Sequence, residues 1–386
     1  MTEIPGPRLI IDAREDAAAA ARRMLGLTLL GRLVLAAERS GFRDIMVLSP
    51  EGSRNLRVLL AAEYQVNVAT VIPDAGGVIT ARVPANILGE SDWLRALAAE
   101  TVTDDACRAA GNGIFLFGPK ATAAQIAAPE TAAPGAPIAF TATPLQIVTA
   151  LDVDTAETRL LGGLVKQTDG FMSRHFARPI SIAISRRLAP HGVTPNQMTM
   201  VSALIGLAAA PFFLSSSPAV QIVGGLLFVL HSVLDGCDGE LARLTYRESR
   251  LGGLLDFWGD NIVHVAVFGC MAVGWHFAEA AVWPLFLGAA AVLGTAGSAA
   301  AVYWLTLRKK TGAGPVYTSV SEGPSAGLTK LLDELSRRDF IYLVLVLSAF
   351  GKANWFLALT AIGAPVFLIL VLLAARRARA ADRARA

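Results

Sequence analysis

Four aspartates in an apolar part of the chain have the residue type and spacing of a reactive site: Asp235, Asp238, Asp256 and Asp260. The members of each pair are three or four residues apart, so on a helix their two carboxylates would lie on one face. If the two helices are antiparallel neighbours, all the carboxylates converge at one end of them. Ionised groups at membrane depth cost at least about 2.5–3.5 kcal/mol each, so they usually pair with cations or metals and mark function.

Divalent cations are the expected partners of this acidic cluster, because close anions would otherwise push the helices apart. Ligation by oxygen alone suits a hard cation, which predicts Mg²⁺ or Mn²⁺. A site with two such ions serves phosphoryl chemistry, since it binds diphosphate oxygens and stabilises the attacking and leaving groups. The alternative is that the aspartates are interfacial residues paired with Arg243, Arg247 and Arg250. Four carboxylates at these spacings favour the metal site.

Small and basic residues around the aspartates suit a nucleotide. Gly239, Gly252 and Gly253 lack side chains, which would let a nucleotide or another backbone approach closely. Arg243 follows Asp238 by about one helical turn and can reach a phosphate as a forked donor. The spacing therefore predicts a site for a nucleoside diphosphate beside the cations.

The composition places these residues in a membrane protein. The chain has 386 residues, of which only 17% are charged, and a mean hydropathy of +0.51, which indicates membrane spans with one soluble domain. A spanning helix needs about 20 largely apolar residues. The candidate spans are 197–215, 219–237, 253–275, 281–306, 339–351 with its flanks, and 353–375.

The distribution of basic residues predicts the orientation of these helices. Lysine and arginine gather in segments 240–250 and 307–338 and in the C-terminal tail, whereas the alternate connections hold almost none. By the positive-inside rule the basic segments are cytoplasmic, so both termini and the acidic cluster face that side. The net charge of +3 arises from these clusters and not from basic residues interleaved with aromatics, so no nucleic-acid partner is expected. The N-terminus carries no secretory signal, which predicts a cytoplasmic first domain.

The complete pattern, Asp-x2-Asp-Gly-x2-Ala-Arg-x8-Gly-x3-Asp-x3-Asp, covers residues 235–260 and resembles the signature of the CDP-alcohol phosphotransferase family. The resemblance implies six transmembrane helices, a homodimer, and transfer of a substituted phosphate from a CDP-alcohol to an acceptor hydroxyl with release of CMP. It implies that Asp260 is the general base, with metal contact as a further role. The implied metal ligands are Asp235, Asp238 and Asp256, and the implied CDP-binding positions are Gly239, Ala242, Arg243 and Gly252. Both a lipid donor and a soluble donor present the same CDP group, so the two alcohols stay open.

The segment before the first span adds a narrower resemblance. Residues 168–174, 178–181 and 194–199 are similar to the branch that includes the bifunctional inositol-phosphate cytidylyltransferase/di-inositol-phosphate-phosphate synthases, as is Arg337-Arg-Asp-Phe340. Residues 171–188 alternate apolar side chains with arginines, which is typical of an amphipathic helix on an anionic membrane surface.

The first 160 residues predict an α/β domain, because candidate strands alternate with candidate helices. The strands are expected at 8–12, 43–49, 66–72, 77–83 and 113–117, and the helices at 27–39 and 92–99. Their order resembles a nucleotidyltransferase-like Rossmann-type domain. Such a domain grips nucleotide phosphates with a Gly-rich basic loop after the first strand, whereas residues 12–16 here are acidic and lack glycine. A degenerate domain that supports, regulates or docks is therefore expected.

The predicted chain is thus an α/β nucleotidyltransferase-like cytoplasmic domain followed by an all-α membrane domain. Its regions are a degenerate domain over 1–160, a juxtamembrane amphipathic segment over 161–195, the phosphotransferase domain over 196–376 and a basic tail over 377–386. The leading hypothesis is an integral inner-membrane CDP-alcohol phosphotransferase in phospholipid or inositol-phosphate biosynthesis. The alternatives are a cation transporter that uses the intramembrane carboxylates, and a bifunctional enzyme whose first domain also makes the CDP-alcohol.

Other polar residues have less specific interpretations. His231 and His264 lie four residues from an aspartate, and packing or orienting roles are expected for them because oxygen-rich Mg²⁺ sites rarely use imidazole. Five basic residues flank the fourth and fifth spans and are either topogenic charges or ligands of the acceptor's phosphate: Arg308, Lys309, Lys310, Arg337 and Arg338.

Overall fold

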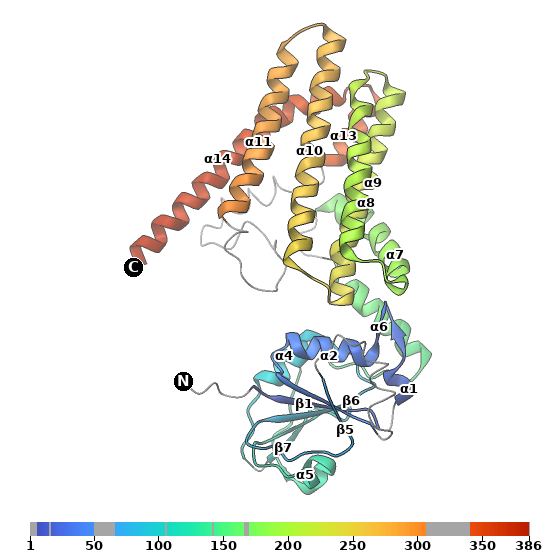
Figure 1. Cartoon of the computed structure of the whole chain (residues 1–386), viewed down its shortest axis with the longest axis vertical. Coiled ribbons are helices and arrows are strands. Elements are labelled where there is room, and N and C mark those ends of the chain that lie inside the picture. Colours follow the sequence, from blue (N-terminus) through green and yellow to red (C-terminus); the bar gives the residue numbers. More distant parts are fainter. Residues whose placement is uncertain are drawn as a thin grey trace. The chain divides into compact units, whose positions relative to one another are not determined.

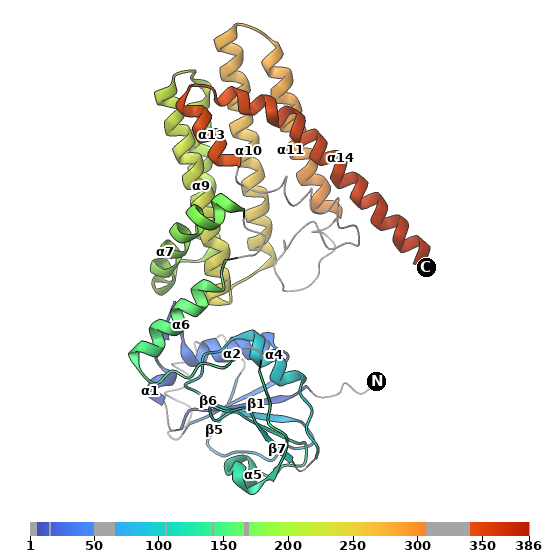
Figure 2. The same ribbon diagram turned by 180° about the vertical axis from the view of Figure 1, so that it is seen from behind.

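The structure is a computed structural model with two compact units, Met1–Gly162 and Gly163–Ala386, which are described separately. The described residues are 6–14, 17–49, 66–104, 106–140, 143–165, 170–305 and 340–385. The first unit contains a β-sheet with helices, and the second is helical (Figures 1 and 2). The predicted order, a sheet-containing region followed by a helical membrane region, is confirmed.

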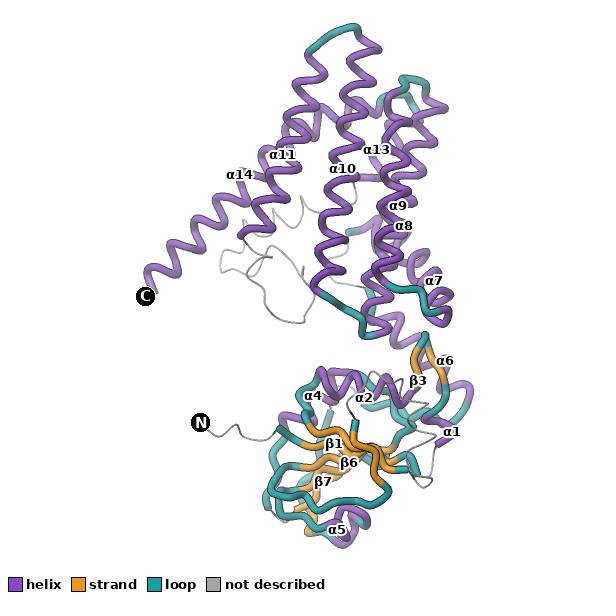
Figure 3. Tube along the Cα trace, in the orientation of Figure 1, coloured by secondary structure: helices purple, strands orange, loops and turns teal. Residues whose placement is uncertain are grey.

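In its described residues, the first unit is built on a seven-stranded mixed sheet of order β5-β4-β1-β6-β8-β7-β9. Figure 3 shows the strands of this unit in orange. The strands are β1 (Arg8–Asp12), β4 (Asp44–Leu48), β5 (Asn67–Ala69), β6 (Thr80–Pro84), β7 (Ala106–Ala109), β8 (Phe115–Phe117) and β9 (Ala133–Pro134). A separate short hairpin joins β2 (Arg23–Met24) to β3 (Leu27–Thr28). Strand β1 pairs in parallel with β4 and β6, whereas β8 is antiparallel to β6 and β7.

Burial on both faces explains why the central strand is continuously apolar. Leu9, Ile10 and Ile11 of β1 are fully buried, as expected for a parallel strand covered on both sides. Helices α2 and α4 cover one face and α5 the other (Figure 1). The helices of this unit are α1 (Ala17–Ala20), α2 (Leu29–Arg39), α4 (Ser91–Ala99), α5 (Ala123–Ala127) and α6 (Ala150–Gly162).

The five strands and two helices expected from the sequence are present, with ends displaced by a few residues. Strands β7 and β9 were not expected. The β7 residues, Ala-Cys-Arg-Ala, have weak strand propensity, and β9 is two residues long and contains a proline. Strand β7 pairs with β8, and β9 pairs with β7. Propensity calculated for one segment cannot predict strands that form through pairing with distant segments.

In its described residues, the second unit contains five helices that are long and apolar enough to cross a membrane: Pro195–Leu214, Pro218–Thr245, Arg250–Glu279, Trp283–Leu305 and Ala353–Arg376. In the secondary structure these correspond to α8 (Pro195–Ala209) with its 3₁₀ continuation, α9 (Pro218–Thr245), α10 (Arg250–Glu279), α11 (Trp283–Leu305) and α14 (Ala353–Arg385). A shorter apolar helix, α13 (Phe340–Ala349), lies where the fifth predicted span was expected. The five long helices identify an integral membrane protein.

Local signals in the sequence fix where these helices begin. Thr194 accepts a hydrogen bond from the backbone of Gln197 in a capping box, and Pro195 occupies the first turn of α8. The hydroxyl of Ser249 accepts from the backbone N–H of Gly252 at 3.0 Å and caps α10. Before the juxtamembrane helix α7 (Arg178–Leu188) lies a short π-helical segment, Ser173–Ala177.

Helices α9 and α10 extend further than the apolar segments alone predicted. The second span was expected to end at 237 and the third to begin at 253, whereas α9 continues to Thr245 and α10 begins at Arg250. Hydropathy ends a span at its polar residues, but the backbone hydrogen bonds of a helix continue through them. All four aspartates therefore lie within helices. Only four residues join the two helices, and Tyr246 begins this turn in the left-handed region with φ 56°.

Candidate active site

The helical hairpin of α9 and α10 brings three of the four aspartates together. Asp235 and Asp238 of α9 and Asp256 of α10 each offer one carboxylate oxygen, and these oxygens lie within 4.8 Å of one another. The two α9 aspartates are buried. From the sequence, all four carboxylates were expected to converge, and the structure groups three of them, at the end where the short turn joins α9 to α10. Helix α8 packs against both of these helices.

Asp260 lies one helical turn beyond Asp256 and stands apart from the three-carboxylate group. It lines the same cavity as Asp238 and Asp256. Its Oδ1 atom lies 3.6 Å from Nε2 of His231, whose other ring nitrogen, Nδ1, lies 2.9 Å from the carbonyl oxygen of Ser202. The structure therefore separates a group suited to holding a cation from a fourth carboxylate that faces the cavity.

Helix α8 holds one of the aspartates in place through Thr199. The Thr199 hydroxyl donates a hydrogen bond of 2.5 Å to Oδ2 of Asp238, and the other carboxylate oxygen accepts from the backbone N–H of Gly239. Thr199 is itself buried and lines the cavity. Sequence reasoning quoted the segment 194–199 for its resemblance but did not select Thr199, because the partner is 39 residues away.

A cavity of about 540 Å³ opens beside the carboxylates. All four positions implied for CDP binding, Gly239, Ala242, Arg243 and Gly252, line it. A β-carbon on Gly252 would lie 2.9 Å from Oδ1 of Asn196, so a larger side chain would displace a lining residue. Arg247, in the turn after α9, also lines the cavity and was not selected from the sequence.

The cavity lining also has a largely apolar part, which we call the apolar arm. Side chains from α11, α13 and α14 line it: Ala299, Val302, Phe340, Phe356, Leu359 and Phe367. Gly363 of α14 also faces this arm, and a β-carbon at Gly363 would have no atom within 4 Å. The arm therefore offers open space against an apolar wall.

The two histidines occupy different places. The ring of His231 is buried and stacks against Phe228 at a centroid distance of 6.1 Å. His264 lines the cavity, and among the described residues its Nε2 atom has no hydrogen-bond partner. Neither imidazole belongs to the three-residue group that could hold a metal. The packing and orienting roles expected for both histidines remain predictions.

The donor set fits a hard divalent cation. Three converging carboxylates supply oxygen atoms only, which Mg²⁺ and Mn²⁺ prefer. Two of the three are buried, where an ionised carboxylate is costly unless its charge is compensated, and a bound cation would supply that compensation. The five basic residues proposed for the acceptor's phosphate, Arg308, Lys309, Lys310, Arg337 and Arg338, lie outside the described residues.

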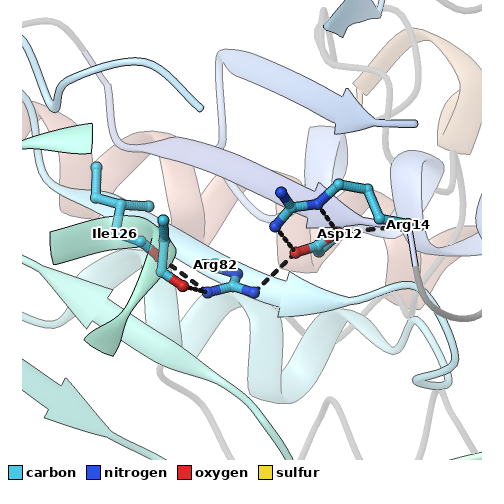
Figure 4. Close-up of polar contacts among 5 residues, drawn as sticks. Asp12, Arg14, Arg82 and Ile126 are labelled. Atoms are coloured by element: carbon cyan, nitrogen blue, oxygen red, sulfur yellow. Dashed lines mark hydrogen bonds and ion pairs between the residues drawn. The ribbon is translucent and has the colours of Figure 1, made fainter. Parts of the chain in front are cut away.

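In the first unit, the expected nucleotide site is at the end of β1, and this edge of the sheet carries a carboxylate paired with arginines. The sheet order reverses at β1, with β4 on one side and β6 on the other, and ligands of open α/β sheets bind at such a switch point. There the carboxylate of Asp12 accepts hydrogen bonds from Arg14 at 2.9 and 2.7 Å and from Arg82 at 2.8 Å (Figure 4). Arg82 also donates to the carbonyls of Ile126 and Ala127 at 2.9 Å.

In this network the charges at the end of β1 are paired with one another. Burial raises the pKa of Asp12, but the hydrogen bonds and positive charge of Arg14, together with Arg82, outweigh it and lower the pKa below the ordinary value. Arg14 and Arg82, the two arginines described at this edge, are thereby paired with a carboxylate. This agrees with the acidic, glycine-free segment that follows β1.

The fold and the site together define a membrane protein whose helices carry a carboxylate group beside a nucleotide-sized cavity. Residues 192–321 match the model of the CDP-alcohol phosphatidyltransferase family. This part of the chain is thus a domain of that family, and the resemblance predicted from the aspartate motif is confirmed.

Curated relatives match the same C-terminal part of the chain. A bifunctional IPC transferase and DIPP synthase of Thermococcus kodakarensis is 42% identical over 139 residues, which are 33% of this chain and 31% of that protein. The protein of the same name from Archaeoglobus fulgidus is 38% identical over 130 residues, 33% of this chain and 26% of that protein. The chain thus spans about a third or less of the length of these relatives.

A solved structure was also matched, that of phosphatidylinositol phosphate synthase from Mycobacterium tuberculosis with CDP-DAG bound. The match has a TM-score of 0.36 at 19% identity and covers 52% of this chain and 93% of that one.

Proposed function

We propose that the helical unit is a divalent-metal-dependent CDP-alcohol phosphotransferase. It would move a substituted phosphate from a CDP-alcohol to an acceptor hydroxyl and release CMP. The observation that carries the proposal is the convergence of three carboxylates beside a cavity that is also lined by Gly239, Ala242, Arg243 and Gly252. The family match over 192–321 supports the same reaction class.

The residues take distinct roles in this reaction. Asp235, Asp238 and Asp256 would hold the cations, which when bound neutralise the diphosphate and the charge that develops as CMP departs. Thr199 keeps Asp238 in its ligand orientation through the 2.5 Å hydrogen bond. The guanidinium of Arg243 would donate to a phosphate oxygen as a forked donor.

Asp260 would act as general base. It would accept the proton of the acceptor hydroxyl, whose oxygen forms a new bond to the phosphorus of the donor alcohol's phosphate. The bond between that phosphorus and the bridging oxygen then breaks, and CMP leaves with the electron pair. The position of Asp260 on the cavity wall, outside the three-carboxylate group, supports this division of labour.

The apolar arm supports a substrate that carries a hydrocarbon chain. Among the described residues, the polar groups of this part of the lining are hydroxyls such as those of Thr295, Ser298 and Thr360, and the rest of the wall is aliphatic and aromatic. A CDP-linked lipid would place its nucleotide at the aspartates and its chain in this arm. Relatives named bifunctional IPC transferase and DIPP synthase support instead a soluble inositol-phosphate substrate. Which CDP-alcohol serves as donor distinguishes these two possibilities.

Filling the apolar arm separates these donors. Gly363→Leu adds a side chain where a β-carbon has no neighbour within 4 Å, so the helix keeps its packing while the arm loses space. With a lipid donor such as CDP-diacylglycerol we expect kcat/KM to fall at least about tenfold, the usual cost of a misfit in an apolar pocket. Turnover of a soluble CDP-alcohol should be unchanged.

The matched control for this variant is Gly269→Leu. Gly269 lies on α10, also has nothing within 4 Å of a β-carbon, and does not line the cavity. Equal losses in both variants would mean that the apolar arm holds no substrate.

Several features of the proposal come from the family resemblance and the charge pattern. They include a sixth span over 339–351, a homodimer, location in the inner membrane, and an active site with both termini on the cytoplasmic side. In the same proposal the first unit is a degenerate nucleotidyltransferase-like domain with a supporting, regulating or docking role. The Asp12–Arg14–Arg82 network supports that role, because it occupies the switch point of the sheet.

The direct test is a panel of donors and acceptors with purified protein. CMP release and product mass are measured with lipid and soluble CDP-alcohols, with Mg²⁺ and with excess chelator. We expect CMP release that requires both the cation and an acceptor hydroxyl. Cation flux into liposomes without CMP release from any donor would favour the transporter alternative and reject the enzyme.

A further inference from the structure

Glu240 is a buried acid on the face of α9 that contacts α7, and it has no role in the chemistry described above. Glu240 lies two residues beyond Asp238, and at 3.6 residues per turn the two side chains point about 200° apart around the helix. Asp238 meets Thr199 and the cavity, whereas Glu240 meets the juxtamembrane helix α7. The Glu240 side chain is fully buried, and charged side chains are rarely buried without a specific partner.

Three side chains of α7 satisfy this carboxylate. The guanidinium of Arg178 donates to Oε1 at 2.9 Å, and Ser181 donates to the same oxygen at 2.6 Å. Ser185 donates to Oε2 at 2.7 Å. The hydroxyl-bearing residues are at most 1% exposed, so the contact is a closed polar cluster on three successive turns of one helix face.

The neighbouring residues of α9 are shaped for the same contact. A β-carbon on Gly236 would lie 3.2 Å from Nη1 of Arg178 and 3.5 Å from the Ser181 hydroxyl. The thiol of Cys237 lies 3.5 Å from the carbonyl oxygen of Ser181. Helix α7 therefore sits close against α9 along the turn that also carries the metal-binding aspartates.

We infer that Glu240, clamped by Arg178, Ser181 and Ser185, is a positioning residue for the cation site. It fixes the rotation of α9 about its axis, so that Asp238 faces the cavity on the opposite side. The inference rests on the proposed function only for the identity of the cation and the nucleotide. A buried ion pair is a poor source of net stability but, in some proteins, a good device for fixing one arrangement.

The pair Arg178→Met with Glu240→Leu tests this inference. Replacing both members of a buried ion pair by apolar residues of similar size is often neutral for stability, and the two serines can turn back to helix carbonyls. We expect a melting temperature close to that of the wild type. We expect the dissociation constant for Mn²⁺, measured by electron paramagnetic resonance, to rise about 10–100-fold, the range seen when groups that orient metal ligands are lost.

The kinetic readout distinguishes positioning from general loss of structure. KM for the donor should rise and kcat should fall in the folded double variant, whereas a purely structural contact would change neither. Arg187→Met, an exposed arginine of the same helix, is the matched control and should leave Mn²⁺ affinity, KM and kcat unchanged.

Specific outcomes would overturn the inference. A folded double variant with wild-type Mn²⁺ affinity and kinetics would do so. If the double variant does not fold, Glu240→Gln decides, because it keeps the size of the side chain and removes the charge; wild-type Mn²⁺ affinity in that variant would also overturn it. If the wild-type protein binds Mn²⁺ but releases no CMP, the proposed function is rejected and this inference is not. The Mn²⁺ dissociation constants of the wild type and the double variant still test whether Glu240 positions the cation site.

Discussion

Asp256→Asn is expected to abolish CMP release while leaving the protein folded. Asp256 is the only member of the three-carboxylate group that α10 contributes, so its loss removes the bridge between the two helices at the cation. Bound metal typically supplies several kcal/mol of transition-state stabilisation, which corresponds to a rate loss of at least about 10³-fold. Mn²⁺ affinity should fall together with turnover.

Stability gives this prediction a second, independent readout. Asparagine has nearly the same shape as aspartate, and removing one of three close anions relieves repulsion when no cation is bound. The melting temperature in chelator should therefore equal or exceed that of the wild type, whereas the gain in melting temperature on adding Mg²⁺ should shrink. Asp92→Asn, an exposed carboxylate of the first unit, is the matched control. Retained turnover in Asp256→Asn would reject the site.

Asp260→Asn is expected to separate catalysis from cation binding. If Asp260 is the general base, kcat should fall about 10²–10⁴-fold, the usual contribution of positioned proton transfer. Mn²⁺ affinity should stay close to the wild-type value, because Asp260 lies outside the group whose oxygens converge within 4.8 Å. The contrast with Asp256→Asn is the informative result.

The two measurements also reveal the other role considered for Asp260. A loss of Mn²⁺ affinity in Asp260→Asn as large as that in Asp256→Asn would make Asp260 a metal ligand. A wild-type pH profile with an acidic limb that disappears in Asp260→Asn, at unchanged Mn²⁺ affinity, would support the general base. Full activity in the variant would exclude both roles.

The part of the site that could be predicted is the part that is local in sequence. Asp235 and Asp238 share a helix face by spacing alone, as do Asp256 and Asp260, and the short basic segment between the pairs favours an antiparallel hairpin. Structure adds a distinction within the four: three of them converge, and Asp260 faces the cavity one turn away. That distinction depends on how the two helices are rotated about their axes, which periodicity does not specify.

Residues that act across long sequence separations were missed. The hydrogen bond from Thr199 to Asp238 spans 39 residues, and that from Ser185 to Glu240 spans 55. Neither residue type is unusual in a helix, so no local signal marks it. The juxtamembrane helix illustrates the same limit: its alternation of apolar and basic side chains predicts a surface helix, but its buried serines are explained only by the acid on α9.

The first unit shows how far pattern and topology agree. The order of candidate strands and helices predicted β1, β4 and β6, while the absence of glycine after β1 predicted the loss of a phosphate-binding loop. The pairing of Asp12 with Arg14 and Arg82 was not predictable, since Arg82 lies on a neighbouring strand 70 residues away.

The four-residue turn between α9 and α10 brings the three proposed cation ligands close together in the sequence. All three converging carboxylates lie within 22 residues, from 235 to 256, so closing the chain segment between them costs little conformational entropy. The apolar arm of the cavity, in contrast, needs α11 and α14, which come later in the chain. During synthesis the three carboxylates proposed to hold the cation, and α7 and α8 that orient them, therefore precede the helices that complete the lining of the cavity.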